Sequence, residues 1–129
     1  MIRLAVTLLL GWPLAGMGAW QTLDESPEGL RLIDPARVEA RGGALHFHER
    51  LLLTAGKIDP ASLRPMREVL ERRVLDCGTR RVATLSRAVF SDQDALIEHR
   101  AAPYAQLKAS DWRVLPADDP RVRLLCRRP

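Results

Sequence analysis

The sequence predicts an α+β domain: an antiparallel β-sheet of about five or six strands, with a C-terminal helix tied to it by one disulfide. Three observations support this fold class. Short runs of alternating apolar and polar residues recur along the chain, separated by glycine, proline and aspartate. Asp119 followed by Pro120 is a typical helix start. The only two cysteines, Cys77 and Cys126, can connect that helix to the middle of the chain.

The N-terminus has the features of a secretory signal peptide. Arg3 supplies a positive charge, an apolar run follows, and small residues lead to Ala19. We expect cleavage after Gly18 or Ala19, so that residues 1–19 are the signal peptide and residues 20–129 are one exported domain. No cysteine lies near the cleavage site, so we expect no lipid attachment there, and no later segment that crosses a membrane. The predicted location is the periplasm, the outer-membrane surface or the medium.

Export changes the interpretation of the two cysteines. In an oxidising compartment an even number of cysteines predicts a disulfide, and with only two the pair is Cys77 with Cys126. Closing a loop of about 50 residues removes unfolded-state entropy worth roughly 4 kcal/mol. A redox or nucleophilic thiol is less consistent with the sequence, because there is no Cys-x-x-Cys motif and no evident histidine partner.

The clearest local signal is a β-hairpin around Gly42 and Gly43. Residues 37–41 and 44–49 alternate in polarity, and two glycines supply the positive φ angles of a two-residue turn. Such a turn gives one apolar and one polar face, and a shift of one residue would destroy this division. The apolar pairs are Val38 with Phe47 and Ala40 with Leu45, and the polar pairs are Glu39 with His46 and Arg37 with His48.

The elements near the two ends are predicted from shorter patterns. Residues 20–29 are expected to be an irregular lead-in, followed by a strand over residues 30–34 that ends at a proline. Residues 55–65 contain glycine and two prolines and are expected to form a surface loop. Residues 112–115 form a last short strand, and a helix of about eight residues begins after Asp119.

The middle of the chain leaves two alternatives open. Residues 66–75 fit a helix or a strand, and the favoured interpretation is a strand from about Arg72 with residues 79–91 as its antiparallel partner. Residues 95–100 form the next strand. A two-residue loop before it pairs Val89 with Leu96 and Arg87 with Glu98, whereas a three-residue loop pairs Phe90 with Leu96 and Val89 with Ile97.

Two histidines on one predicted strand are the residues most similar to a functional site. His46 and His48 are two positions apart, share a strand face and lie opposite Glu39. Zinc binding by these imidazoles needs a third and a fourth ligand. The candidates for those ligands are Asp34, Glu49, Glu98 and His99. Otherwise the histidines belong to a solvated sheet face with a Glu39–His46 cross-strand contact.

Arginines on the same predicted face indicate a second kind of site. Arg37, Arg41 and Arg50, together with the two histidines, are consistent with a basic surface for an anionic partner such as a glycan or lipid head group. The alternative is an ordinary charged sheet exterior. Nucleic acid is not an expected partner, because the formal net charge is only +4, acidic residues are interleaved with the arginines and aromatics make up 5% of the chain.

Catalysis is not predicted. No serine lies in a nucleophile-elbow pattern, and no glycine-rich phosphate loop is present. Turn and helix-cap chemistry accounts for the paired carboxylates Asp92 with Asp94 and Asp118 with Asp119. We therefore expect a protein that is not an enzyme and that needs no cofactor.

Three short motifs lie along the chain: Leu75-Asp76-Cys77, Trp112-Arg113-Val114-Leu115-Pro116, and a terminal helix that carries Cys126. Together they resemble the motifs of the bacterial surface-adhesin protein E family. The resemblance covers nearly all of residues 20–129 and implies an antiparallel sheet with a disulfide-tied C-terminal helix. The best-known member of that family is an outer-membrane lipoprotein that binds host matrix and serum proteins and forms dimers. This chain has no lipid-attachment cysteine near its predicted cleavage site, and no host-binding residue of that member can be matched to it.

The predicted function is that of an exported, non-enzymatic binding or interaction protein whose ligand is unknown. Its expected partner is a protein or an anionic glycan or lipid at the cell envelope, and the resemblance raises a homodimer as an option. The alternative is a small periplasmic metal-binding protein that uses His46 and His48. A third class, a structural envelope component joined through a sheet edge, is not separated from the first by the sequence.

Overall fold

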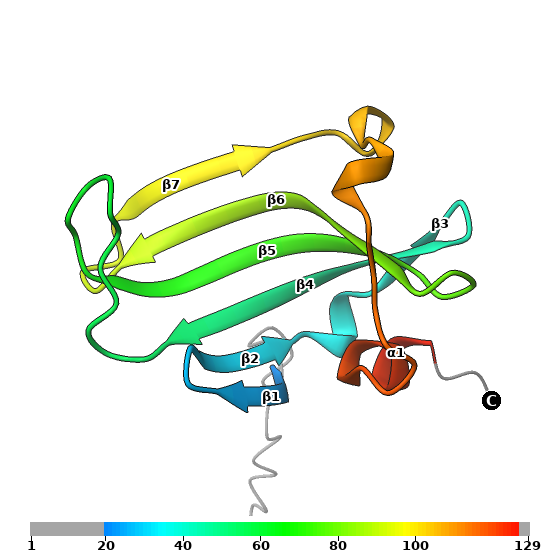
Figure 1. Cartoon of the computed structure of the whole chain (residues 1–129), viewed down its shortest axis with the longest axis horizontal. Helices are drawn as coiled ribbons and strands as arrows, with labels where there is room; N and C mark the ends of the chain where they lie inside the picture. The colour runs from blue at the N-terminus through cyan, green and yellow to red at the C-terminus, as the bar shows by residue number, and fades with distance from the viewer. Residues whose placement is uncertain (1–19, 127–129) are drawn as a thin grey trace, which may run out of the picture.

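Residues 20–126, which the computed structural model describes, form an eight-stranded antiparallel sheet with a short helix (Figure 1). The elements are β1 (Gln21–Ser26), β2 (Gly29–Ile33), β3 (Glu39–Arg41), β4 (Ala44–Leu53), β5 (Met66–Asp76), β6 (Arg81–Ser91), β7 (Leu96–Ala101), β8 (Arg113–Val114) and α1 (Pro120–Leu125). Six strands follow one another as β1-β2-β4-β5-β6-β7, while β3 pairs with β4 and β8 pairs with β6. This architecture confirms the predicted fold class. The predicted signal peptide and residues 127–129 lie outside the described residues.

The β3–β4 hairpin forms with the predicted register, but the predicted pairs of Val38 with Phe47 and of Arg37 with His48 lie outside its ladder. Glu39 lies opposite His46, as a two-residue turn requires. Gly42 and Gly43 have φ angles of 56° and 82°, which side-chain-bearing residues rarely adopt. Strand β3 is shorter than the expected residues 37–41, because Arg37 belongs to a 3₁₀ turn formed by Pro35–Arg37. Proline has no N–H for a ladder and has a fixed φ suited to such a turn.

The sheet extends further at its N-terminal edge than the sequence predicts. The expected lead-in contains β1, which pairs with β2 so that Glu25 lies opposite Leu30. An outer strand is paired on one side only and needs no continuous apolar face, so its polar sequence carries little strand signal. Leu23 is the apolar residue of β1 that packs against the core cluster beneath α1.

Strand β5 is longer than predicted. It begins at Met66 rather than near Arg72, and the helical interpretation of residues 66–75 is wrong. This strand forms ladders with β4 on one side and β6 on the other. Strand pairing of this kind overrides a local spacing of apolar residues that also suits a helix.

The β6–β7 hairpin follows the three-residue alternative at its turn only. Phe90 lies opposite Leu96, as that alternative requires. A bulge then shifts the ladder, so that Val89 lies opposite Glu98 and its expected pairing with Ile97 is wrong. The last elements are also shorter than predicted, with two residues in β8 and six in α1.

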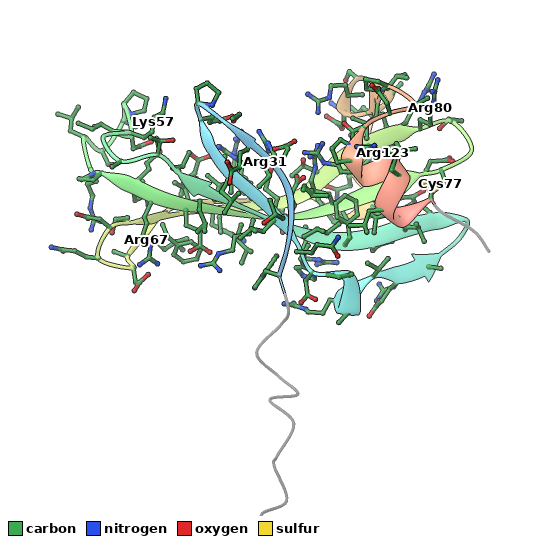
Figure 2. All side chains as sticks on the ribbon, turned by 90° about the horizontal axis from the view of Figure 1, so that it is seen from below. Arg31, Lys57, Arg67, Cys77, Arg80 and Arg123 are labelled. Carbon is green, nitrogen blue, oxygen red and sulfur yellow. A yellow bond between two sulfur atoms is a disulfide. The ribbon has the colours of Figure 1, made fainter. Side chains whose placement is uncertain are left out.

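Helix α1 covers one face of the sheet, called here the helix face. Val122 and Leu125 pack against a cluster formed by Ile33, Phe47, Leu75, Val82 and Leu115. Because side chains alternate along a strand, Val74 points the other way. On that opposite face, Leu107 and Trp112 pack against Ala44, Val74, Ala83 and Leu85. Figure 2 shows Cys77 and Arg123 at the end of the sheet that carries α1, and Lys57 and Arg67 at the opposite end.

Two attachments hold α1 on the sheet. The disulfide between Cys77, just after β5, and Cys126, at the end of α1, confirms the predicted pair. The second attachment was not predicted. Arg121 of α1 donates to one oxygen of the Glu49 carboxylate at 2.6 Å, and Arg73 of β5 donates to the other at 2.8 Å. Glu49 is 1% exposed, so each charge depends on its partners to remain buried.

A tight backbone approach makes Gly29 a sensitive position. Its φ is 155°, and a Cβ atom there would overlap the carbonyl oxygen of Leu52 and lie 2.9 Å from the carbonyl carbon. Gly29→Ala is therefore expected to lower the free energy of unfolding by about 1–3 kcal/mol, measured by chemical denaturation. Gly56→Ala is the control, because Gly56 also has a positive φ, 92°, but has no atom within 4 Å of the place that a methyl group would take. Equal losses in both variants would rule out a contribution from the contact with Leu52.

Candidate anion-binding site

A pocket of about 480 Å³ lies where β3 and the 3₁₀ turn meet β4. His46 and His48 come from alternate positions of β4, so both point to the face opposite α1. Arg72 of β5 lies directly across the ladder from His48. The polar residues that line this basic pocket are Arg37, Glu39, Arg41, His46, His48 and Arg72.

Local chain geometry brings these side chains together from three segments. The Gly42-Gly43 turn folds β3 back on β4 and places Glu39 beside His46. The 3₁₀ turn then carries Arg37 to the next histidine, where its Nη2 lies 3.2 Å from the Nε2 of His48. A guanidinium only donates hydrogen bonds, so the Nε2 of His48 accepts this one.

The pocket holds more positive than negative charge. Arg41 forms an ion pair with Glu39, and both side chains are exposed. Within residues 20–126, Arg37 and Arg72 have no carboxylate oxygen within 4.0 Å. The lining therefore has three guanidinium charges against one carboxylate. Two guanidinium groups that lack a protein counter-charge are available to an anion from outside.

The surroundings of the two histidines favour their neutral form. Burial lowers the pKa of His48 below 6.5, and the nearby charges of Arg37 and Arg72 lower it further. Burial likewise lowers the pKa of His46, with contributions from Arg41 and Arg72. The Nδ1 atoms of both rings are buried and have no hydrogen-bond partner among the described residues. The ring of His46 also lies 5.7 Å from that of Tyr104.

The structure brings together only some of the residues of the predicted basic surface. Arg37 and Arg41 line the pocket with the histidines, but Arg50 does not. Arg50 instead donates to both carboxylate oxygens of Glu68 at 2.8 and 3.0 Å, and its guanidinium lies 5.8 Å from the Trp20 ring. Arg72 is the pocket residue that the sequence did not indicate. Its position depends on the register between β4 and β5, which are joined by a 12-residue connection rather than a short turn.

The alternative metal site has no third ligand grouped with His46 and His48 among residues 20–126. Zinc sites use three or four protein ligands. Among residues 20–126, no three His, Cys, Asp or Glu side chains come together in a way that could hold a metal ion. Of the candidate ligands, Glu49 points to the helix face and binds Arg73 and Arg121. Glu98 forms ion pairs with arginines on β6 and β7.

Comparison with known proteins places the chain in a family. The sequence model described as "Surface-adhesin protein E" matches residues 20–126. Two crystal structures of Haemophilus influenzae protein E are each 18% identical to this chain with a TM-score of 0.50; they cover 74% of it, and it covers 76% and 79% of them. A structure of protein E from non-typeable Haemophilus influenzae has the same identity and TM-score, with coverage of 84% of this chain and 74% of that one.

The structural likeness concerns the fold, and the family match rests on the sequence. No curated protein sequence matches the chain. In the part of the chain that the structure describes, no helix is long and apolar enough to span a membrane. The matched region contains the whole sheet, both cysteines and α1. The chain therefore belongs to the surface-adhesin protein E family.

Proposed function

We propose that this protein is an exported, non-enzymatic binding protein that recognises an anionic glycan at the cell envelope through the basic pocket. Family membership supports an adhesin-like binding role and an exported or cell-surface location. The observation that supports an anionic ligand is the pair Arg37 and Arg72, which line a pocket of about 480 Å³ without a carboxylate partner in residues 20–126. A volume of this size suits a small ligand or one or two sugar units.

A glycan suits the pocket better than a membrane surface does. Basic surfaces that bind membranes combine cations with exposed apolar side chains that enter the lipid. The large apolar side chains exposed in the described region are Ile58, Leu63, Leu96, Tyr104 and Val114, and none of them lines the pocket. Sulfate or carboxylate groups on a sugar are matched by the fork of N–H donors that each guanidinium presents.

The chemistry of the lining supports binding rather than catalysis. The pocket is lined by arginines, two neutral histidines, one glutamate and the apolar residues Ala36, Val38 and Phe47. No serine, threonine, cysteine or lysine lines this pocket, and its one carboxylate, Glu39, forms an ion pair with Arg41. The alternative metal-binding function has two imidazoles but no third ligand grouped with them in residues 20–126.

Arg72→Gln tests the proposed site. We expect this variant to bind a sulfated tetrasaccharide about tenfold to a hundredfold more weakly than the wild type, because hydrogen bonds to charged groups contribute about 1.5–3 kcal/mol. Isothermal titration calorimetry at near-physiological salt measures the change. Arg113→Gln is the matched control: it removes the same charge from exposed strand β8, outside the pocket.

Three outcomes separate the alternatives. Loss in Arg72→Gln alone supports the pocket. Equal loss in both variants indicates attraction by the overall charge, which salt would screen, and contradicts the proposal. Tight binding to anionic lipid vesicles without binding to the sulfated tetrasaccharide would replace the glycan by a membrane.

The homodimer stays a prediction; β7 is the last strand of the main sheet order, and its open edge is where a second chain could pair.

A further inference from the structure

We propose that acid strengthens anion binding in the basic pocket, because His48 and His46 become hydrogen-bond donors to the bound anion when they are protonated. This inference rests on the proposed function, since it concerns the same pocket. It adds a regulatory property: the protein would hold an anionic glycan more tightly in a mildly acidic environment than in a neutral one.

The contact between Arg37 and His48 is the starting point. In the neutral pocket, the Nη2 of Arg37 lies 3.2 Å from the Nε2 of His48, which accepts its hydrogen bond. An anion must therefore compete with His48 for this donor. The accepting role of Nε2 leaves the proton of the neutral ring on Nδ1, which is buried without a partner among residues 20–126.

Protonation reverses the role of the ring. A histidinium has a proton on each nitrogen, so Nε2 and the Arg37 guanidinium become two donors that face one another. An oxyanion between them accepts from both and removes the repulsion. Protonation thus releases Arg37 from its contact with His48 and supplies a second donor at the same place. The empty pocket resists the proton, whereas the occupied pocket favours it.

The charged surroundings of His48 reinforce this coupling. Arg37 approaches from the 3₁₀ turn and Arg72 from β5, and both disfavour a proton on the ring. The charge of Asp34 and a hydrogen bond of the ring with the Arg37 backbone have the opposite effect, and Asp34 is the only carboxylate among residues 20–126 that acts on His48. Burial and these two arginines hold the pKa of the free histidine below its usual value, so a proton on the ring is disfavoured until an anion offsets the arginines.

His46 has a similar but weaker environment. Arg41 and Glu39 face it from β3 with opposite effects, and Arg72 faces it from β5. The Tyr104 ring packs near it from the connection after β7. Because the Nε2 of His48 is in direct contact with the Arg37 guanidinium, which an anion can bridge, we expect His46 to respond less to an anion than His48 does. The first proton taken up on binding is assigned to His48.

Linkage sets the size of the effect. If binding takes up one proton, the association constant rises by up to about tenfold for each pH unit between the pKa values of the bound and free states. By the same reciprocity, a bound anion raises the histidine pKa. We therefore expect binding of a sulfated tetrasaccharide to strengthen about tenfold between about pH 7.5 and about pH 5.5, which corresponds to an average uptake of about half a proton over this range.

Calorimetry on the purified exported protein tests this inference. A sulfated tetrasaccharide without carboxylates is the probe, because its sulfate esters keep their charge over this pH range and the pH dependence then belongs to the protein. Titrations in two buffers with different ionisation enthalpies count the protons taken up. In parallel, the NMR chemical shifts of the histidine ring protons, with and without the probe, show which ring titrates.

His48→Gln should abolish most of the pH dependence, whereas the matched control His99→Gln on β7 should retain it. The inference would be overturned if binding by a double variant, His48→Gln with His46→Gln, kept its pH dependence. It would also be overturned if the wild type took up no proton on binding. Binding that is independent of pH but is lost in Arg72→Gln would leave the proposed function intact. No binding at either pH would reject both.

Discussion

Glu49→Ala is expected to lower the free energy of unfolding by about 3–5 kcal/mol, because it leaves two buried arginines without their shared carboxylate. Glu49 accepts hydrogen bonds from Arg73 of β5 and from Arg121 of α1, and Arg121 also pairs with Asp119 at 3.3 Å. The Arg121 side chain is 6% exposed, so bulk water has little access to its charge. Urea denaturation followed by circular dichroism measures the loss.

Glu25→Ala is the control for this prediction. Glu25 is an exposed carboxylate on edge strand β1 and should tolerate truncation within about 0.5 kcal/mol. A loss below about 1 kcal/mol in Glu49→Ala would show that the buried charges are not mutually dependent. Arg121→Met should also destabilise, but it leaves Glu49 paired with Arg73, so its cost should be smaller.

The same network predicts a loss of stability in acid. Burial raises the pKa of Glu49, but the charges and hydrogen bonds of Arg73 and Arg121 outweigh it and leave the pKa below 4.5. The unfolded chain therefore binds this proton at a higher pH than the folded protein does. The stabilisation is complete above about pH 4.5 and is lost as the pH falls through the lowered value. Glu49→Gln should show a shallower decline of stability below that pH.

Cys126→Ser is expected to lower the free energy of unfolding by about 4 kcal/mol, because it opens a loop of about 50 residues in the unfolded chain. The bond joins Cys77 to the end of a six-residue helix, which is too short to be stable by itself. Hydrogen exchange should show faster exchange in α1 than in β4 and β5. Thermal unfolding with and without a reducing agent measures the change.

Two comparisons test the role of the disulfide. Cys77→Ser should have the same effect as Cys126→Ser, and a reducing agent should destabilise the wild type but neither variant. An unchanged melting temperature of the wild type under reducing conditions would contradict the prediction. In the reduced protein, the contacts of Arg121 with Glu49 still connect α1 to the sheet. Helix docking is therefore expected to weaken rather than to disappear.

Local patterns were sufficient for the elements whose signals are contained within a few residues. The Gly42-Gly43 hairpin was predicted with its register, because turn chemistry and face polarity agree there. Asp119 and Pro120 begin α1 as predicted, with the Asp119 carboxylate accepting from the N–H of Arg121. Strand β1 was missed because an edge strand needs no apolar face, and β5 was ambiguous because its spacing suits two periodicities.

Only the part of the candidate site that lies within a short stretch of sequence could be predicted. His46, His48, Arg37 and Arg41 lie within one hairpin and its entry, so sequence spacing grouped them. Arg72 lines the pocket although the sequence did not indicate it, and Arg50 lies outside the pocket although it was predicted to belong there. Both positions depend on contacts with residues far along the chain. The position of Arg72 depends on the β4–β5 register. That of Arg50 depends on where its partner carboxylate lies.

The sequence by itself determined the fold class, the disulfide pair, the central hairpin and the family resemblance. Each rests on residue identity or on short-range spacing, which the covalent chain preserves. Only the tertiary structure shows that Glu49 is buried beneath α1, where its carboxylate accepts hydrogen bonds from Arg73 and Arg121. It also decided that Arg72 joins two histidines beside Arg37. Both arrangements bring together charges from distant segments, and their energies depend on burial and register, which are defined only when the strands pair.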